Sequence, residues 1–95
     1  MTSNPSHTIV RLATSLDLGA ATPLASELVA LRGHPVELDA GEVRRIGGQC
    51  LQVLLAARAT WAADGQDFSI VNPSPDFLEG LALMGAADLS HSDAI

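Results

Sequence analysis

The sequence predicts an α/β fold in which a small β-sheet packs against helices. Short segments with the alternating or β-branched pattern of strands are separated by longer segments with the period of amphipathic helices. Such alternation is typical of a mostly parallel sheet with helical crossovers. We expect a small mixed sheet of about four strands, packed against three to four helices. The 95 residues suit one domain, 1–95, with an ordered core of about 8–89.

The first strand and helix are expected within the first third of the chain. His7–Ala13 has the β-branched content of a strand, with Val10 and Leu12 on one face and Ile9 on the other. Residues 16–19 are expected to turn. Thr22 then suits an N-cap, with Pro23 as the first helical residue. The apolar stripe of this helix comprises Leu24, Leu28 and Leu31, and Gly33 supplies the left-handed stop.

The central third predicts a strand, a connecting segment and a long helix. Pro35–Asp39 alternates apolar and acidic residues, as a strand does, and 42–46 is a brief extended or turning segment. Gly47-Gly48 leads into a helix over Gln49–Ala63. Its expected apolar face comprises Leu51, Leu54, Leu55, Arg58 and Ala62, with Val53 and Trp61 nearer the edges. Trp61 is expected to pack at the core or its edge, and Arg58 either lies along the core or pairs with an acid such as Asp39.

The last third predicts a buried strand and a third helix. Phe68–Val71 suits the strand. Ser74 suits the N-cap and Pro75 the first helical position, while Gly85 is expected to end the helix. Its apolar side comprises Phe77, Leu78, Leu81 and Met84. The polar tail, 90–95, is expected to fray.

Composition excludes several classes of partner. Five arginines oppose eleven acidic residues, giving a formal net charge of −6. A chain with a net negative charge is repelled by nucleic-acid phosphates and anionic lipid, so we expect neither nucleic-acid binding nor membrane insertion. Arg44-Arg45 is a local exception that fits either a contact for an acidic partner or a solvated turn. Residues 1–7 carry no leader pattern and no run of about 20 apolar residues occurs, so a cytoplasmic protein is expected.

No constellation of residues predicts an enzyme, a metal site or a cofactor. The single Cys50 rules out an internal disulfide, and His34, the nearest histidine, lies 16 residues away in sequence. His7 and His91 are isolated from the other candidate ligands. Gly47-Gly48 has neither the G-x-G-x-x-G spacing nor a Walker lysine.

The order of short motifs resembles the STAS domain family, the fold of anti-sigma-factor antagonists. Leu16-Asp17 precedes the first helix and Leu38-Asp39 ends the second strand, as in the family. Val43–Leu51 falls on the family's Asp-Ser-Ser/Ala-Gly-Leu turn, and Ser74-Pro75 and Leu83-Met84-Gly85 fall on its last helix. The resemblance covers Thr8–Leu89.

The turn departs from the family pattern at the positions that matter for regulation. In the family, a serine of this turn is phosphorylated by a partner kinase and an adjacent aspartate positions it. The aspartate position is Gly47 here, and the serine positions are Gly48 and Gln49. We therefore expect no phosphosite in the turn, since the nearest hydroxyl beyond it is Thr60.

A docking surface for a protein is the function that remains. Helix N–H groups after Gly47-Gly48 form a mild anion site, and whether this site binds an anion or nucleotide stays open. The outward face of the second helix is small, partly apolar and lightly charged. The predicted partner-binding residues are Arg45, Gly47, Gly48, Gln49, Gln52, Val53 and Ala56.

The run Val43–Leu54, with glutamine-cysteine in the turn, is similar to small STAS proteins associated with chemotaxis gene clusters. That resemblance implies a non-enzymatic module in bacterial signal transduction that binds the chemotaxis histidine kinase CheA and modulates phosphate flow. Two alternatives stay open. One is an anti-sigma factor antagonist that binds an anti-sigma kinase. The other is a STAS subunit of a lipid-transport ABC complex, which would contact an ATPase through the second helix.

Overall fold

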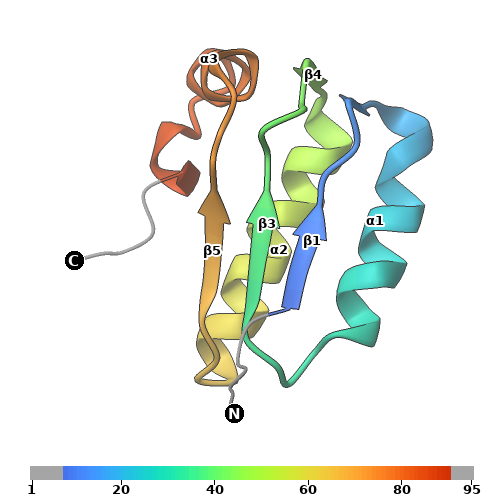
Figure 1. Cartoon of the computed structure of the whole chain (residues 1–95), viewed down its shortest axis with the longest axis vertical. Coiled ribbons are helices and arrows are strands. Elements are labelled where there is room, and N and C mark those ends of the chain that lie inside the picture. The colour runs from blue at the N-terminus through green and yellow to red at the C-terminus, as the bar shows by residue number, and fades with distance from the viewer. Residues whose placement is uncertain (1–7, 91–95) are drawn as a thin grey trace, which may run out of the picture.

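The computed structural model describes residues 8–90 of the chain. Strands and helices alternate through most of it (Figure 1). The elements are β1 (Thr8–Arg11), β2 (Ser15–Leu16), α1 (Leu18–Ala30), β3 (Val36–Asp39), β4 (Arg45–Ile46), α2 (Gly48–Ala63), β5 (Phe68–Val71), α3 (Pro75–Leu83) and the 3-10 helix η1 (Ala87–Ser90).

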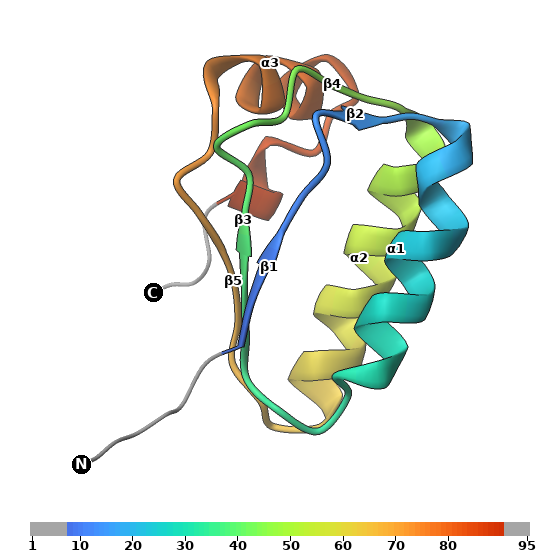
Figure 2. The ribbon, with the colours of Figure 1, turned by 45° about the vertical axis from the view of Figure 1, so that its right-hand side comes forward.

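The main sheet has three parallel strands in the order β1-β3-β5. Val10, Leu38 and Ile70 lie opposite one another in the register, and all three are buried. Their neighbours alternate to the other face, where Ile9 is 61% exposed. Helices α1 and α2 lie side by side along one face of the sheet, and α3 lies beyond the carboxyl ends of its strands (Figure 2). The core therefore lies between the sheet and the α1–α2 pair and continues to the buried residues of α3 and η1.

The α/β fold class is confirmed, with five strands rather than about four. The additional pair, β2 and β4, is a separate two-stranded parallel sheet in which Ser15 lies opposite Arg45 and Leu16 opposite Ile46. Every strand pairing within residues 8–90 is parallel. Two-residue strands are too short to produce an alternating pattern, so this pair was not predictable from periodicity.

Helix α1 begins earlier than predicted, because the predicted turn over 16–19 is partly strand and partly helix. Asp17 is the N-cap in place of Thr22, and Pro23 lies inside the helix. The β2–β4 pairing holds Leu16 in a strand, so the chain enters the helix directly after it. Pro23 has no N–H to donate to the carbonyl of Gly19, and this cost falls in the second turn, near the helix start. The buried stripe is as predicted, with Leu24 and Leu28 buried and Leu31 packed against them.

Helix α2 begins one residue before the predicted start, and its buried face matches the predicted one at Leu51 and Leu54 but differs toward its C-terminal end. Trp61, placed near the edge by periodicity, is 2% exposed, whereas Ala62 is exposed. The buried residues of α2 are Cys50, Leu51, Leu54, Ala57 and Trp61. Ala62 was misplaced because alanines occur on both the buried and the exposed sides of α2, as Ala57 and Ala56 show. Arg58 does not pair with Asp39; its Nη2 lies 3.8 Å from Asp88 Oδ2 in η1.

Helix α3 follows its predicted start closely. The Ser74 hydroxyl accepts a hydrogen bond from Phe77 N at 3.0 Å and donates one to Val43 O at 2.6 Å. This side-chain cap joins α3 to the segment before β4. Phe77 and Leu81 are fully buried as predicted, but Leu78 is 41% exposed. Met84, also predicted to be buried, is 36% exposed.

The segment after α3 was predicted only in part. Gly85 has a φ of 73° and follows the helix end, as expected. The 3-10 helix η1 was not predicted, and its Leu89 is 2% exposed and completes the core. Most of the tail predicted to fray, 91–95, lies outside the described residues.

Candidate partner-binding site

The turn between β4 and α2 is held next to the start of α1. Gly47 N donates a hydrogen bond to Leu16 O at 2.9 Å, which extends the β2–β4 pairing into the turn. Gly47 is the N-cap of α2 and has extended backbone angles, with no side-chain cap. A shallow hollow at this point is lined by Leu16, Asp17, Leu18, Arg45, Ile46, Gly47, Gly48 and Gln49. Tertiary pairing thus places the starts of α1 and α2 around one surface.

The two glycines of the turn are not required by the packing of the described residues. A Cβ added to Gly48 would meet nothing within 4 Å, and one added to Gly47 would lie 3.7 Å from Leu16 O, an ordinary contact. Neither glycine has a positive φ. By contrast, a Cβ on Gly80 would lie 2.6 Å from Ile46 Cγ2. The packing therefore favours a glycine at 80, whereas it does not require a glycine at 47 or 48.

The exposed face of α2 carries no charged residue. Its exposed positions are Gly48, Gln49, Gln52, Ala56, Ala59, Ala62 and Ala63. The one charged residue of the helix, Arg58, is only partly exposed and extends to Asp88. A helix that is uncharged around almost its whole circumference is typical of one that is covered on both sides. In this structure, α2 is covered by the sheet and by α1, which lies alongside it, and its remaining side faces outward (Figure 2).

The structure brings four of the seven predicted partner-binding residues, Arg45, Gly47, Gly48 and Gln49, around the hollow at the turn. Gln52, Val53 and Ala56 follow along α2, and the last two line the hollow between α1 and α2. The outward orientation predicted for Gln49, Gln52 and Ala56 is confirmed, since all three are exposed. Arg45 and Gly48 are exposed as well. The other two residues, Gly47 and Val53, are partly buried.

The Cys50 thiol lies directly behind the turn and is sealed from solvent. Cys50 is fully buried, and its Sγ donates a hydrogen bond to Asp17 O at 3.3 Å. Burial raises the pKa of this thiol above its ordinary value, and the nearby Asp17 carboxylate raises it further. A raised pKa keeps the sulfur protonated, which is the opposite of the activation that a nucleophilic cysteine needs. Cys50 therefore packs the base of the turn.

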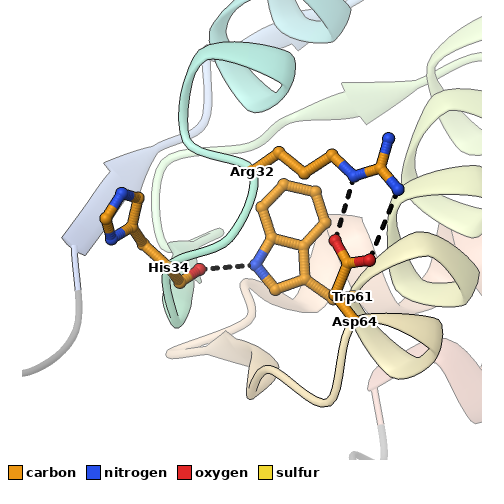
Figure 3. A network of polar contacts seen from close by, with 4 residues as sticks. All are labelled: Arg32, His34, Trp61 and Asp64. Atoms are coloured by element: carbon orange, nitrogen blue, oxygen red, sulfur yellow. Dashed lines mark hydrogen bonds and ion pairs between the residues drawn. The ribbon is translucent and has the colours of Figure 1, made fainter.

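The opposite end of the α1–α2 pair is closed by side-chain contacts (Figure 3). Arg32, after α1, reaches Asp64, after α2, through Nε to Oδ2 at 2.9 Å and Nη2 to Oδ1 at 3.3 Å. Trp61 Nε1 donates to His34 O at 2.6 Å. The Arg32 guanidinium holds the pKa of the Asp64 carboxyl below its ordinary value. These contacts tie the ends of both helices together.

Comparison with known proteins identifies the family. The family model described as "Mlab, STAS domain" matches residues 1–91. The chain belongs to the STAS domain family. The predicted resemblance is therefore confirmed at the level of the family, and the chain is a regulatory protein-interaction module. No curated protein and no solved structure matched the chain.

Helix α1 also contributes to the surface of this STAS domain, which the sequence did not predict. Five α1 residues line a groove together with Gln49 and Val53 of α2, and they are Ala21, Thr22, Ala25, Ser26 and Val29. Their three- and four-residue spacing marks one side of a helix, next to the buried leucine stripe. That signal was present in the sequence, but only the packing of α1 against α2 shows that it meets the predicted site.

Metal ligation and membrane spanning concern the described residues as well. Within residues 8–90, no three or more histidine, cysteine or acidic side chains gather as a metal site would require. Over the same residues, no helix has the length and apolar character to cross a membrane.

Proposed function

We propose that this STAS domain binds the chemotaxis histidine kinase CheA through the outer face of α2 and thereby modulates phosphate flow to response regulators. The contact residues in this proposal are Arg45, Gly47, Gly48, Gln49, Gln52, Val53 and Ala56. The domain acts by occupying the surface of its partner, without carrying a covalent mark.

The observation that carries the proposal is the uncharged exposed face of α2. The chain has eleven acidic residues and five arginines, yet none of them lies among the seven exposed residues of this helix. Interface cores are depleted in charged residues relative to the rest of a protein surface. The two glycines of the turn, Gly47 and Gly48, add support. No packing contact of the described residues requires a glycine at either position, whereas the close approach of a partner to the turn would require one.

The residues of the turn favour CheA over a kinase that phosphorylates its antagonist. Gly47, Gly48 and Gln49 carry no hydroxyl, so the turn has no acceptor for a phosphoryl group. The glutamine-cysteine pair at Gln49-Cys50 is the feature shared with the chemotaxis-associated subgroup. An anti-sigma kinase and a lipid-transport ATPase remain the alternative partners.

Titration calorimetry of the purified chain with CheA tests the proposal. We expect Gln52→Arg to weaken binding at least about tenfold, which corresponds to about 1.4 kcal/mol, because it places a charge at the centre of the uncharged face. The free energy of unfolding should change by less than about 0.5 kcal/mol, since Gln52 is exposed. Ala82→Arg, an equivalent change at an exposed position of α3, serves as the matched control and should leave binding unchanged.

Parallel titrations with an anti-sigma kinase and a transporter ATPase separate the alternatives. If the chain binds the anti-sigma kinase or the ATPase but not CheA, and Gln52→Arg weakens that binding, the result supports the outer face of α2 as the docking face and refutes CheA as the partner. Transfer of labelled phosphate from ATP to this chain would favour the anti-sigma alternative. Unfolding caused by Gln52→Arg, or CheA binding that ignores the substitution, would refute the proposed face.

A further inference from the structure

A continuous groove runs between α1 and α2 from the turn to the closed end. Three hollows share residues: Gln49 belongs to the first and second, and Val53 to the second and third. Two large apolar side chains of α1, Leu18 and Val29, are each 72% exposed along this path. They are eleven residues apart, or about 16 Å along a helix axis. The floor between them consists mainly of small residues, including Ala21, Ala25, Ala56 and Ala57.

The chemistry of the groove restricts what can occupy it. Both walls are helices, whose N–H and C=O groups are largely paired internally, so an extended strand would find no backbone partners there. A helix satisfies its own backbone groups and can be buried in such a groove. The charged residues that line the groove lie at its ends: Asp17 and Arg45 at the turn, and Arg32 at the closed end, where Asp64 holds it at 2.9 Å. The lining between these ends is uncharged, so an occupant must present an uncharged stripe there, and a phosphate group or anionic lipid headgroup would find no cation along the middle of the groove.

The two ends of the groove have opposite electrostatic character. Both α1 and α2 begin at the turn end and run the same way (Figure 2), so both positive dipole ends lie there. Arg45 and Asp17, both exposed, also line that end and their opposite charges offset each other, so the two helix N-termini leave it net positive. Both negative dipole ends and the Asp64 carboxylate lie at the other end, where Arg32 offsets only part of the charge. An occupying helix is thus favoured when its own dipole runs in the opposite direction.

We propose that the α1–α2 groove binds one helix of a partner protein, antiparallel to α1 and α2, through an uncharged stripe and with acidic residues at its C-terminal end beside Arg45. This inference rests on the proposed role as a docking module, and it extends the contact surface from α2 to α1. It makes the small side chains of α1 part of the recognition site.

A displayed library of 18-residue helices tests this inference without CheA. The probe is a helix randomised along one stripe, in two frameworks: acidic residues at the C-terminal end with lysines at the N-terminal end, and the reverse. Selection on the whole chain should enrich uncharged, apolar stripes in the first framework. A selected peptide, made synthetically, should bind the chain at least about tenfold more tightly than the same stripe in the reversed framework.

Two adjacent substitutions locate the binding. Val29→Arg places a charge in the groove and should weaken binding of the selected peptide at least tenfold, whereas Ala30→Arg, also exposed but outside the groove lining, should change it less than twofold. Circular dichroism confirms that both variants fold. Absence of enrichment, equal binding in both frameworks, insensitivity to Val29→Arg or equal loss with Ala30→Arg would each overturn the inference. If a selected peptide binds but CheA does not, the proposal that CheA is the partner is refuted and the helix-binding groove is supported. If CheA binds but no peptide is selected, the helix-binding groove is refuted and the proposed function is not.

Discussion

The two ends of the α1–α2 pair are built from the same helices but by opposite means. At the C-terminal end, Arg32 binds Asp64 and the Trp61 indole donates to His34 O. At the N-terminal end, α2 starts at Gly47 with no side-chain cap. The side-chain hydrogen bond that the structure describes there is the buried one from Cys50 to Asp17 O.

The contacts that stabilise the helix pair lie at its C-terminal end, and the surface proposed to bind a partner lies at its N-terminal end. The closed end fixes the spacing of α1 and α2, so the open end does not need surface contacts of its own. Exposed polar and backbone groups at the turn therefore stay available to a partner. A surface whose groups are already paired within the chain would have to break those contacts in order to bind.

The largest effect is expected at the closed end, from Trp61→Ala. Trp61 is 2% exposed, and its ring lies 6.0 Å from that of Phe68, so the substitution removes a large buried side chain and a hydrogen bond. We expect a loss of about 3–5 kcal/mol in the free energy of unfolding. Trp61 is the only tryptophan, so urea unfolding is followed by far-ultraviolet circular dichroism rather than fluorescence. A loss below about 1 kcal/mol would show that the closed end does not hold the helix pair.

A smaller effect of opposite sign is expected at the open end, from Gly48→Ala. The added methyl group meets nothing within 4 Å, and alanine loses less backbone entropy on folding. We expect an increase of about 0.4–1 kcal/mol in the free energy of unfolding. Gly80→Ala is the matched comparison and should destabilise, because its Cβ would crowd Ile46. Destabilisation by Gly48→Ala would mean that the fold itself requires a glycine at 48.

The smallest effect concerns the Arg32–Asp64 pair, because both side chains are solvent-accessible and salt screens their attraction. The pKa of Asp64 is lowered in the folded state, so folding favours the carboxylate. This stabilisation is present above the carboxyl's unfolded pKa and is lost as pH falls through the lower, folded pKa. Urea midpoints measured from about pH 5 to pH 2 should therefore fall less steeply for Asp64→Asn than for the parent chain. Identical slopes would show that the ion pair makes no contribution.

Features that depend on neighbours in the sequence were predicted correctly. Ser74 and Pro75 start α3, and Gly33 and Gly85 have positive φ values after their helices. These signals are local, because a cap or a left-handed residue acts on the backbone within one turn. The outward side of α2 at Gln49 was predicted for a similar reason, since it follows from helical spacing after the turn.

Features that depend on distant residues were not predicted. The start of α1 at Leu18 follows from pairing between Ser15–Leu16 and Arg45–Ile46, which are 30 residues apart in sequence. The packing of Trp61 at the core was expected, but its two partners, Phe68 and the carbonyl of His34, were not, because both lie outside α2.

The sequence by itself determined the order of the three main-sheet strands and the three α-helices, the cap of α3 and the absence of a hydroxyl in the 47–49 turn, since each is a property of adjacent residues. The tertiary structure alone decided which alanines of α2 are buried and that Val29 of α1 lies beside Val53 of α2. The physical reason is that alanine fits either side of a helix, so only packing against the sheet and α1 selects which alanines are covered. A groove between two helices likewise exists only once both are docked on the same sheet.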